Sequence, residues 1–465
     1  MTRAHRTRTA RSTSGRRSTW RRITSSAIAV GFLGLAGCAG TGGAAATTSI
    51  DYWLWESLQL PGYQKCAEAF EKENPDIDVR ITQYGWGDYW QKLSAGLVAG
   101  AGPDVFTDHL TKYPEFVSRD VLLPLDSLEA TKEIDESGFQ EGLLDLWTGL
   151  DGKRYGMPKD FDTIALFYDN GMLEEAGMTA ADLEGLQWNP EDGGTFEQVI
   201  AHLSIDANGV RGDEPGFDPT NVVTYGLASG GSGGGGHGQT QWSWLAGATG
   251  WKYTNADVWG TEYNYDDPRV QASLEWLFGL VDKGYMPSFE RVGTAPNPQQ
   301  QLGSGQAALS PDGSWTIASY GRLEGIDLGI ASVPAGPIGH PVSMYNGLGD
   351  SISAQTDTPE EAARFVAFLG TDACQTIIGE EGVVFPARPA GTEAAIAAFK
   401  EKRGVDVSPF TDLVKNNYTV LFPVTTHGAE ILSILNPAMD SLYIGNEEVS
   451  TLTEVDARID ALIAE

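Results

Sequence analysis

Residues 50–83 read IDYWLWESLQLPGYQKCAEAFEKENPDIDVRITQ, and this stretch contains the pattern that decides the fold. Ile50 to Trp55 is apolar and aromatic, which favours a strand. Tyr63 to Glu73 has apolar residues at the three- and four-residue spacing of a helix, and Asp78 to Gln83 again favours a strand. A strand, a helix and a second strand in this order predict a βαβ unit.

The alternation continues with a predicted helix at Tyr89 to Ala99 and a buried strand at Asp104 to Thr107. We therefore expect an α/β fold with a mainly parallel sheet and helices on its faces. Two later helices should begin at Thr195 and Thr358, because each threonine precedes Gln or Glu by three residues, the pattern of a capping box. Pro359 then occupies the first helical position of the second helix.

The first 37 residues have the parts of an export signal. Residues 1–22 contain eight arginines and no acid, Ala27 to Ala36 is apolar, and small residues precede Cys38. The apolar run is shorter than the roughly 20 residues of a membrane-spanning helix. Leu35-Ala36-Gly37-Cys38 resembles the lipobox of bacterial lipoproteins, the alternative being an ordinary signal peptide with an incidental cysteine.

The lipobox reading predicts a signal peptide at 1–37, a lipid on Cys38, a flexible tether at 38–48 and a location on the outer face of the cell membrane. The arginine pair before Ile23 also loosely matches a twin-arginine signal. The choice between general and twin-arginine export stays open.

The composition excludes two classes of partner. The chain has 31 basic and 63 acidic residues and a formal net charge of −32, which becomes −40 once the eight leader arginines are removed. Nucleic acids and anionic membrane surfaces are bound by clustered Lys and Arg, so neither is expected to bind this surface. The 13 tryptophans include core residues, but indole rings also form platforms for sugar rings.

Two cysteines remain after Cys38. Cys66 and Cys374 each lie on the apolar face of a predicted helix. Outside the membrane, an even pair favours a disulfide, and the alternative is two buried thiols that pack as small apolar side chains.

Several catalytic and cofactor motifs are missing from the sequence. The glycine run Gly230 to Gly238 lacks the Lys-Ser/Thr of a phosphate-binding loop, so it is interpreted as a flexible loop. The histidines show no metal-binding spacing, and no Gly-x-Ser-x-Gly nucleophile motif is present. No cofactor and no metal are predicted.

Asp160 and Asp162 are two residues apart, so an extended chain projects both carboxylates to one side. With Glu56 or Asp108 they could form the acid/base pair of a glycoside hydrolase. They could equally accept hydrogen bonds from sugar hydroxyls beside a stacking tryptophan. A third interpretation is that both are solvated loop acids, and spacing alone does not separate the three.

Motifs in a fixed order along the chain resemble the bacterial extracellular solute-binding proteins that serve carbohydrate importers, and more distantly the maltose-binding proteins. The matching segments are Phe70 to Val79, Asp88 to Leu93, Gly102 to Val105, Leu122 to Asp126, Gly152 to Pro158, Ala165 to Asn170, Ala307 to Trp315, Asn346 to Ile352 and Ala362 to Leu369. The sequence departs from the family at Tyr168-Asp169, where Tyr-Asn is usual.

The resemblance implies a two-lobed periplasmic-binding-protein-like fold with interleaved lobes, hinge strands and a central ligand cleft. A chain of this length also favours two domains, and no linker divides it into halves. Lobe 1 would comprise 49–158 and 350–402, and lobe 2 would comprise 159–349 and 403–465. The hinge crossings would lie near 159–164 and 345–350, which leaves both cysteines in lobe 1.

The resemblance also implies a set of ligand-binding residues, most of which follow predicted strands, where α/β folds bind ligands. They are Trp55, Glu56, Tyr84, Trp86, Asp108, Asp160, Asp162, Trp242, Trp244, Trp315, Asn346, Gly347 and Arg388. Trp315 is expected to be a stacking platform, and the alternative is a core residue.

These features together predict a monomeric binding lipoprotein, not an enzyme. It would bind an oligosaccharide or glucoside and deliver it to the transmembrane subunits of an ABC permease. The alternatives are a secreted glycoside hydrolase and a binding protein for a polyol phosphate, for which Lys159 and Arg388 would supply the positive charge.

Overall fold

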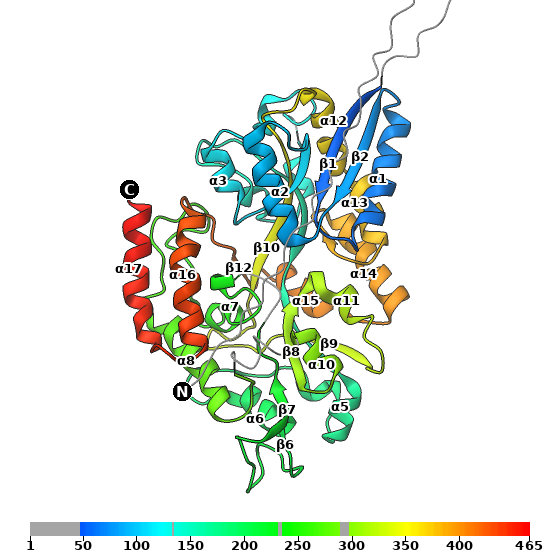
Figure 1. Ribbon diagram of the computed structural model, residues 1–465. Helices are drawn as coiled ribbons and strands as arrows, with labels where there is room; N and C mark the ends of the chain where they lie inside the picture. The colour runs from blue at the N-terminus through cyan, green and yellow to red at the C-terminus, as the bar shows by residue number, and fades with distance from the viewer. Residues whose placement is uncertain (1–46, 133, 231–234, 289–296) are drawn as a thin grey trace, which may run out of the picture. The chain divides into compact units, whose positions relative to one another are not determined.

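The computed structural model describes residues 47–132, 134–230, 235–288 and 297–465. The predicted signal peptide, Cys38 and most of the predicted tether lie outside the described residues, as does the middle of the Gly230–Gly238 run. The described chain contains two β-sheets with helices packed around them (Figure 1). The predicted α/β class is therefore confirmed.

The larger sheet has seven strands in the order β11-β4-β10-β3-β1-β2, with β12 paired to β10. Its strands β1, β2 and β3 pair in parallel, as the βαβ pattern predicts, whereas β10 is antiparallel to both β3 and β4. The expectation of a mainly parallel sheet is therefore wrong here, because β10 lies antiparallel between β3 and β4, and β11 is antiparallel to β4. The strands are β1 (Thr48–Leu54), β2 (Ile77–Gln83), β3 (Val105–His109), β4 (Met157–Asp162), β10 (Ser343–Ile352), β11 (Phe385–Pro386) and β12 (Thr419–Leu421).

The smaller sheet has five strands in the order β6-β7-β8-β5-β9, of which only β7 and β8 pair in parallel. Its strands are β5 (Ile164–Asp169), β6 (Ile205–Asp206), β7 (Val222–Leu227), β8 (Ala307–Gly313) and β9 (Leu328–Ala331). The chain passes directly from β4 of one sheet to β5 of the other at Thr163. At this point Ile164 N–H donates to Ser343 Oγ at 2.7 Å, which joins the passage to the start of β10.

The helices surround both sheets, and α16 and α17 lie side by side near the C-terminus (Figure 1). No described helix is long and apolar enough to cross a membrane. The helices are α1 (Leu60–Glu73), α2 (Trp86–Ala99), α3 (Tyr113–Ser118), α4 (Leu143–Leu146), α5 (Asn170–Glu175), α6 (Gly194–Leu203), α7 (Ser243–Gly247), α8 (Pro268–Asp282), α10 (Pro298–Gly303), α11 (Ile317–Tyr320), α12 (Pro359–Leu369), α13 (Asp372–Glu380), α14 (Pro389–Arg403), α15 (Ser408–Lys415), α16 (Gly428–Tyr443) and α17 (Leu452–Ile463).

The elements predicted between residues 50 and 107 all exist, and their ends differ from the prediction by at most three residues. In α1 the buried residues include Tyr63, Cys66, Ala67 and Phe70, the three- and four-residue spacing seen in the sequence. This stripe packs toward α13, so the helical pattern in the sequence reports a real core contact.

The predicted capping boxes are wrong in detail. The residue that precedes α6 is Gly193, with a φ of 73°, and Thr195 Oγ1 instead accepts a hydrogen bond from Gln187 N–H at 2.9 Å. Thr358 does precede α12, with Pro359 next, but its hydroxyl makes no capping hydrogen bond. The unusual Asp169 caps α5 by accepting from Gly171 N–H at 3.1 Å, which gives this departure from the family a local structural role.

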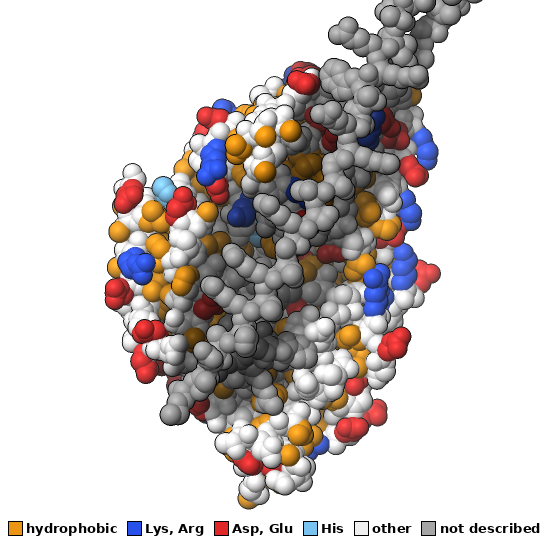
Figure 2. Space-filling view, in the orientation of Figure 1, with side chains coloured by type: hydrophobic (Ala, Val, Ile, Leu, Met, Phe, Trp, Pro, Cys, Tyr) orange, Lys and Arg blue, Asp and Glu red, His pale blue; other side chains and the backbone are white. Residues whose placement is uncertain are grey.

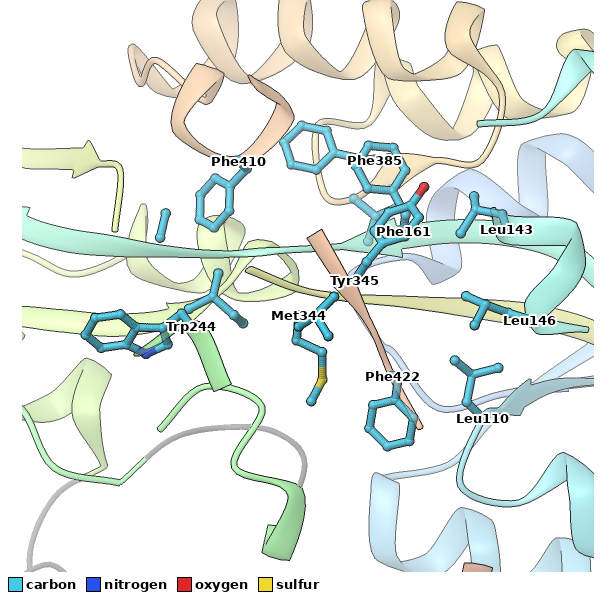
Figure 3. Close-up of a cluster of buried hydrophobic side chains, with 14 of the residues drawn as sticks. Leu110, Leu143, Leu146, Phe161, Trp244, Met344, Tyr345, Phe385, Phe410 and Phe422 are labelled. Atoms are coloured by element: carbon cyan, nitrogen blue, oxygen red, sulfur yellow. The ribbon is translucent and has the colours of Figure 1, made fainter. Parts of the chain in front are cut away.

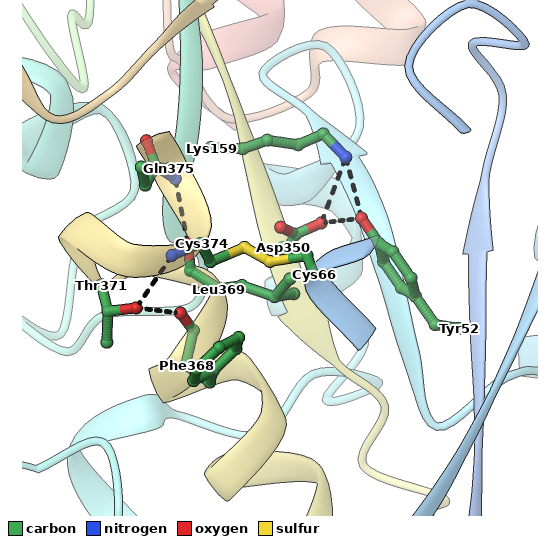
Figure 4. The surroundings of a disulfide bond; sticks show 9 residues. All are labelled: Tyr52, Cys66, Lys159, Asp350, Phe368, Leu369, Thr371, Cys374 and Gln375. Atoms are coloured by element: carbon green, nitrogen blue, oxygen red, sulfur yellow. Dashed lines mark hydrogen bonds and ion pairs between the residues drawn. A yellow bond between two sulfur atoms is a disulfide. The ribbon is translucent and has the colours of Figure 1, made fainter. Parts of the chain in front are cut away.

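A disulfide joins Cys66 of α1 to Cys374 of α13, with a Cα–Cα distance of 5.3 Å (Figure 4). Both cysteines are fully buried. The bond links residues 308 positions apart in the sequence, so it fixes α13, which follows β10, to a helix from the start of the domain.

A buried ionic network lies next to the disulfide (Figure 4). Lys159 Nζ donates to Tyr52 Oη and to Thr107 Oγ1, both at 2.8 Å, and lies 3.7 Å from Asp350 Oδ1. Tyr52 Oη also donates to Asp350 Oδ1 at 2.8 Å, and the ammonium group lies 3.6 Å from the ring centre of Tyr63. The network therefore ties together β1, β3, β4, β10 and α1.

Apolar side chains fill the space around the strands that pass between the sheets. Figure 3 shows Met344 and Tyr345 of β10 among phenylalanines from other elements. Phe161 of β4 stacks on Phe385 of β11, with ring centres 5.5 Å apart, and lies 5.7 Å from Tyr345. This core packs β4, β10 and β11 together on the face of β4 that carries Phe161.

The disulfide predicts a definite thiol count. Denatured without reductant, a chain that begins after Cys38 should show no free thiol, and it should show two after reduction. Two titratable thiols before reduction would contradict the disulfide. The double variant Cys66→Ser/Cys374→Ser should unfold in urea with about 2–4 kcal/mol less stability than the parent.

The ionic network predicts a strong effect of breaking one partner. Lys159→Met should lower the free energy of unfolding by about 3–5 kcal/mol, because it leaves Asp350 buried without its cation. The double variant Lys159→Met/Asp350→Asn should recover much of that loss. Equal stability of the parent and the single variant in urea unfolding would show that the pair is not a structural element.

Candidate functional site

Four rings gather where β1 and β3 end and α2 begins. Trp55 follows β1, Trp86 and Trp90 lie one helical turn apart at the start of α2, and His109 ends β3. The ring centre of Trp55 lies 5.1 Å from that of Trp86 and 5.4 Å from that of Trp90, and Trp86 lies 5.7 Å from His109. Trp86 is 52% exposed. These four residues, the aromatic group below, present apolar ring surface to solvent.

Asp160 and Asp162 lie on β4, opposite Leu348 and Asn346 of β10. In this regular antiparallel register both carboxylates share a face with Asn346, and the bulge between Leu348 and Gly349 lies beyond them, at Lys159. Their side chains are buried, with 1% and 5% of the residue exposed. The interpretation of these residues as solvated loop acids is therefore wrong.

Burial dominates the electrostatics of the two carboxyl groups. Loss of solvation raises the pKa of Asp160 to about 7, against the opposing effect of Lys159. Burial and the neighbouring Asp160 raise the pKa of Asp162 well above its ordinary value. Two ionised carboxylates separated by two strand residues, about 7 Å, would repel by about 2 kcal/mol at an effective dielectric constant of 20.

His109 and Asn346 bring the aromatic group and the carboxyl pair together. Asn346 Nδ2 lies 3.4 Å from His109 Nε2, and Asn346 pairs with Asp162 in the sheet. Burial lowers the pKa of His109 to about 4, so the imidazole is neutral at physiological pH. The candidate site therefore contains an exposed tryptophan, a neutral imidazole, an amide and two carboxyl groups that lie next to one another.

The smaller sheet contributes Ser314 and Trp315, which directly follow β8. Ser314 Oγ donates to Asp162 Oδ1 at 2.8 Å, so this turn meets the carboxyl pair of the other sheet. Trp315 is partly buried, and its ring lies over Gly313, where a side chain would collide with it at about 2.0 Å. The backbone at Gly313 thus sets the position of the predicted platform.

Four other predicted residues lie near these groups and have local partners. Glu56 Oε1 accepts from Leu58 N–H at 3.0 Å, and the ring of Tyr84 packs edge-on against Trp53 at 4.9 Å. Asp108 is fully buried and accepts from His109 N–H at 2.7 Å, so it holds the backbone next to the imidazole. The last of the four, Gly347, faces Leu143 and the Asp160 carbonyl, and a side chain there would be too close to both.

Two other predicted ligand residues have partners within the described structure, and their ligand role stays a prediction. Trp244 is 1% exposed and packs edge-on against Phe196, and its indole N–H donates to Thr240 O at 3.2 Å, so it is a core residue (Figure 3). Arg388 lies over the ring of Phe139 at 4.4 Å and bonds to Gly370 O, so its guanidinium serves the packing of α13 and α14.

Trp242 is also fully buried, among Trp251 and Tyr253, but its indole nitrogen has no hydrogen-bond partner among the described residues. A buried donor of this kind is uncommon in protein interiors. It stays a predicted ligand residue.

Sequence reasoning missed Trp90, His109 and Ser314. The i, i+4 spacing of Trp86 and Trp90 was an available signal, but the predicted helix began at Tyr89, three residues after the start of α2. His109 directly follows the predicted Asp108, and Ser314 directly precedes the predicted Trp315. Their roles depend on contacts between β3, β4, β8 and β10, which are distant in the sequence.

Two lysines lie near the predicted site residues, Lys112 beside Asp108 and His109 and Lys92 over the ring of Tyr84 at 5.1 Å. The buried basic side chains other than histidine are Lys159 and Arg154, and Arg154 pairs with Asp126 at 2.8 Å. Lys159 is committed to the ionic network, and Arg388 to its own packing. Over the face seen in Figure 2, acidic and basic side chains are interspersed with apolar ones.

The chain belongs to the family of bacterial extracellular solute-binding proteins, whose model matches residues 65–408. Membership in this family of binding proteins implies export from the cell. The sequence is 29% identical over 172 residues to a lactose-binding protein of Rhizobium radiobacter, a match that covers 36% of this chain and 40% of the relative. It is 25% identical to a maltodextrin-binding protein of Bacillus subtilis, over 70% of each chain.

The fold is that of the two-domain periplasmic binding proteins. An ABC substrate-binding protein of Listeria monocytogenes, solved in complex with cycloalternan, superposes with a TM-score of 0.73 at 20% identity. The superposition covers 90% of this chain and 99% of that protein. The expected fold class is therefore confirmed, whereas the lobe boundaries stay predictions.

Proposed function

We propose that this protein captures an oligosaccharide outside the cell and delivers it to an ABC-type permease. The observation that carries the proposal is the contact between His109 and Asn346, which joins exposed aromatic rings to buried carboxyl groups. A sugar has apolar ring faces and a hydroxyl edge, so it needs a stacking surface and hydrogen-bonding groups side by side.

The predicted ligand-binding residues come from both sheets, which suits a protein that closes around its ligand. The aromatic group, Asp160, Asp162 and Asn346 belong to the larger sheet, and Trp315 follows a strand of the smaller one. A ligand that touches both sheets would favour the arrangement in which they approach each other. The lobes would be 49–158 with 350–402, and 159–349 with 403–465.

The proposal also includes export of the protein from the cell and its attachment to the membrane by a lipid. Residues 1–37 would direct export, Cys38 would receive a lipid, and residues 38–48 would tether a monomeric domain to the outer face of the membrane. The sugar class is supported by relatives named for lactose and maltodextrin. A tethered binding protein raises the concentration of its ligand next to the permease.

The glycoside hydrolase alternative has less support. The relatives named above are binding proteins.

The proposal predicts stabilisation by a sugar without its hydrolysis. Maltotriose, lactose and an arabinotriose should be screened for a rise in melting temperature. A ligand at about one hundred times its dissociation constant adds about 2.7 kcal/mol of stability. Chromogenic glycosides should remain intact in the same preparation. Glycoside turnover, or a flat response to a broad panel of mono- and oligosaccharides, would contradict the proposal.

The predicted role of Trp315 is a stacking platform. Trp315→Ala should change the stability of the ligand-free protein by no more than about 1 kcal/mol. It should weaken sugar binding by about 2 kcal/mol or more, as loss of an aromatic anchor does. Urea unfolding and calorimetric titration measure the two effects.

Trp244→Ala is the matched control, because it removes a core indole and should cost about 3–5 kcal/mol of stability. A comparable loss of stability for Trp315→Ala, with affinity preserved, would assign Trp315 to the core.

A further inference from the structure

The imidazole of His202 meets a hydrogen-bond acceptor at each of its two ring nitrogens. His202 lies in the last turn of α6, and its Nδ1 lies 2.8 Å from Asp213 Oδ2. Its Nε2 lies 3.0 Å from the carbonyl oxygen of Ala176, the residue that follows α5. Carbonyl and carboxylate oxygens accept hydrogen bonds, and a neutral imidazole has one N–H whereas an imidazolium has two. Both contacts are therefore satisfied when the ring is protonated.

Arg211 makes a second cationic contact at the same place. Its guanidinium donates to His202 O at 2.7 Å and to Glu175 O at 3.0 Å. The acceptors of the two cations thus include carbonyl oxygens at the C-terminal ends of α5 and α6, where the helix dipole favours positive charge. Arg211 and Asp213 both belong to the segment between β6 and β7, residues 207–221, called the β6–β7 loop below.

Other contacts hold the β6–β7 loop whatever the charge of His202. Asp206, the last residue of β6, accepts hydrogen bonds from three backbone N–H groups of the loop. Tyr285 Oη donates to Gly212 O at 3.0 Å. Loss of the His202 contact should therefore loosen the loop locally without unfolding the protein.

We propose that a protonated His202 fastens the β6–β7 loop to the C-terminal ends of α5 and α6, and that the loop loosens when this proton is lost. The hydrogen bond to Ala176 O raises the pKa of His202 above its ordinary value of 6.5, and Asp213 adds to this effect. Partial burial and the like charge of Arg211 oppose it. Because the folded-state pKa is raised, the fastening is strongest below the ordinary pKa and is lost as the pH rises through the raised one.

The fastened loop lies beside α6 and β7, at the lower end of Figure 1. Export of this family exposes the loop to the pH outside the cell. The β6–β7 loop would therefore be held in mildly acidic surroundings and be looser in alkaline ones. This inference concerns the ligand-free protein and does not rest on the proposed sugar.

The charge of His202 can be measured by NMR. With histidine labelled with ¹⁵N, spectra are recorded from about pH 5 to about pH 9, and His202→Gln assigns the signals. Both ring nitrogens should carry a proton at the acidic end, and one proton should be lost at a pH above the ordinary 6.5. Asp213→Asn, which keeps an acceptor oxygen but removes the charge, should move this titration to lower pH. A ring already neutral at about pH 6, or a titration at or below the ordinary value, would overturn the proposal.

Hydrogen exchange measures the fastening itself. Gly212 N–H, between Arg211 and Asp213 in the sequence, donates to Ser204 O at 3.0 Å. Its protection factor, which corrects for the intrinsic pH dependence of exchange, should fall by about threefold or more as His202 loses its proton. In His202→Gln the protection factor should no longer change over this pH range.

His427→Asn is the matched control. His427 is an exposed histidine that precedes α16, and asparagine tolerates its φ of 58°. The fall in the protection of Gly212 should remain in this variant. A protection factor that stays constant through the titration of His202, or that loses its pH dependence in His427→Asn, would overturn the fastening.

Discussion

The buried ion pair between Lys159 and Asp350 is the contact on which the site depends. Lys159 lies on β4 and Asp350 on β10, and through Tyr52 and Thr107 the pair also engages β1 and β3. A charge in this position is tolerated because each partner has several hydrogen bonds. The pair thereby fixes the relative position of the two strands that carry Asp160, Asp162 and Asn346.

In the short segment from Lys159 to Asp162, residues that stabilise the fold alternate with residues that face the candidate site. Lys159 and Phe161 hold β4 in place, one through the ionic network and the other through the stack with Phe385. Asp160 and Asp162 face the candidate site, because the regular register of β4 on β10 puts them on the same face as Asn346. Stability and binding are thus divided between alternate residues of one strand, as the pleat of a strand allows.

The site combines contributions that a single element could not provide. The aromatic group needs the ends of β1 and β3 beside the start of α2, and the carboxyl pair needs β4 beside β10. Ser314 then adds a contact from the smaller sheet to Asp162. This hydrogen bond links the smaller sheet directly to the carboxyl group of Asp162.

The sequence by itself determined the α/β class, the first five elements and the residues that end strands, because local periodicity and strand-end position are properties of short segments. It also indicated Trp55, Trp86, Asp160, Asp162 and Asn346 as site residues, through the resemblance to a family. Only the tertiary structure placed Trp244 in the core and gave Arg388 its packing role. It also revealed His109 as the residue between the aromatic and carboxyl groups and showed that Asp160 and Asp162 are buried without a free cation. These properties depend on which strands pair and in which register, and pairing between distant segments leaves no local pattern in the sequence.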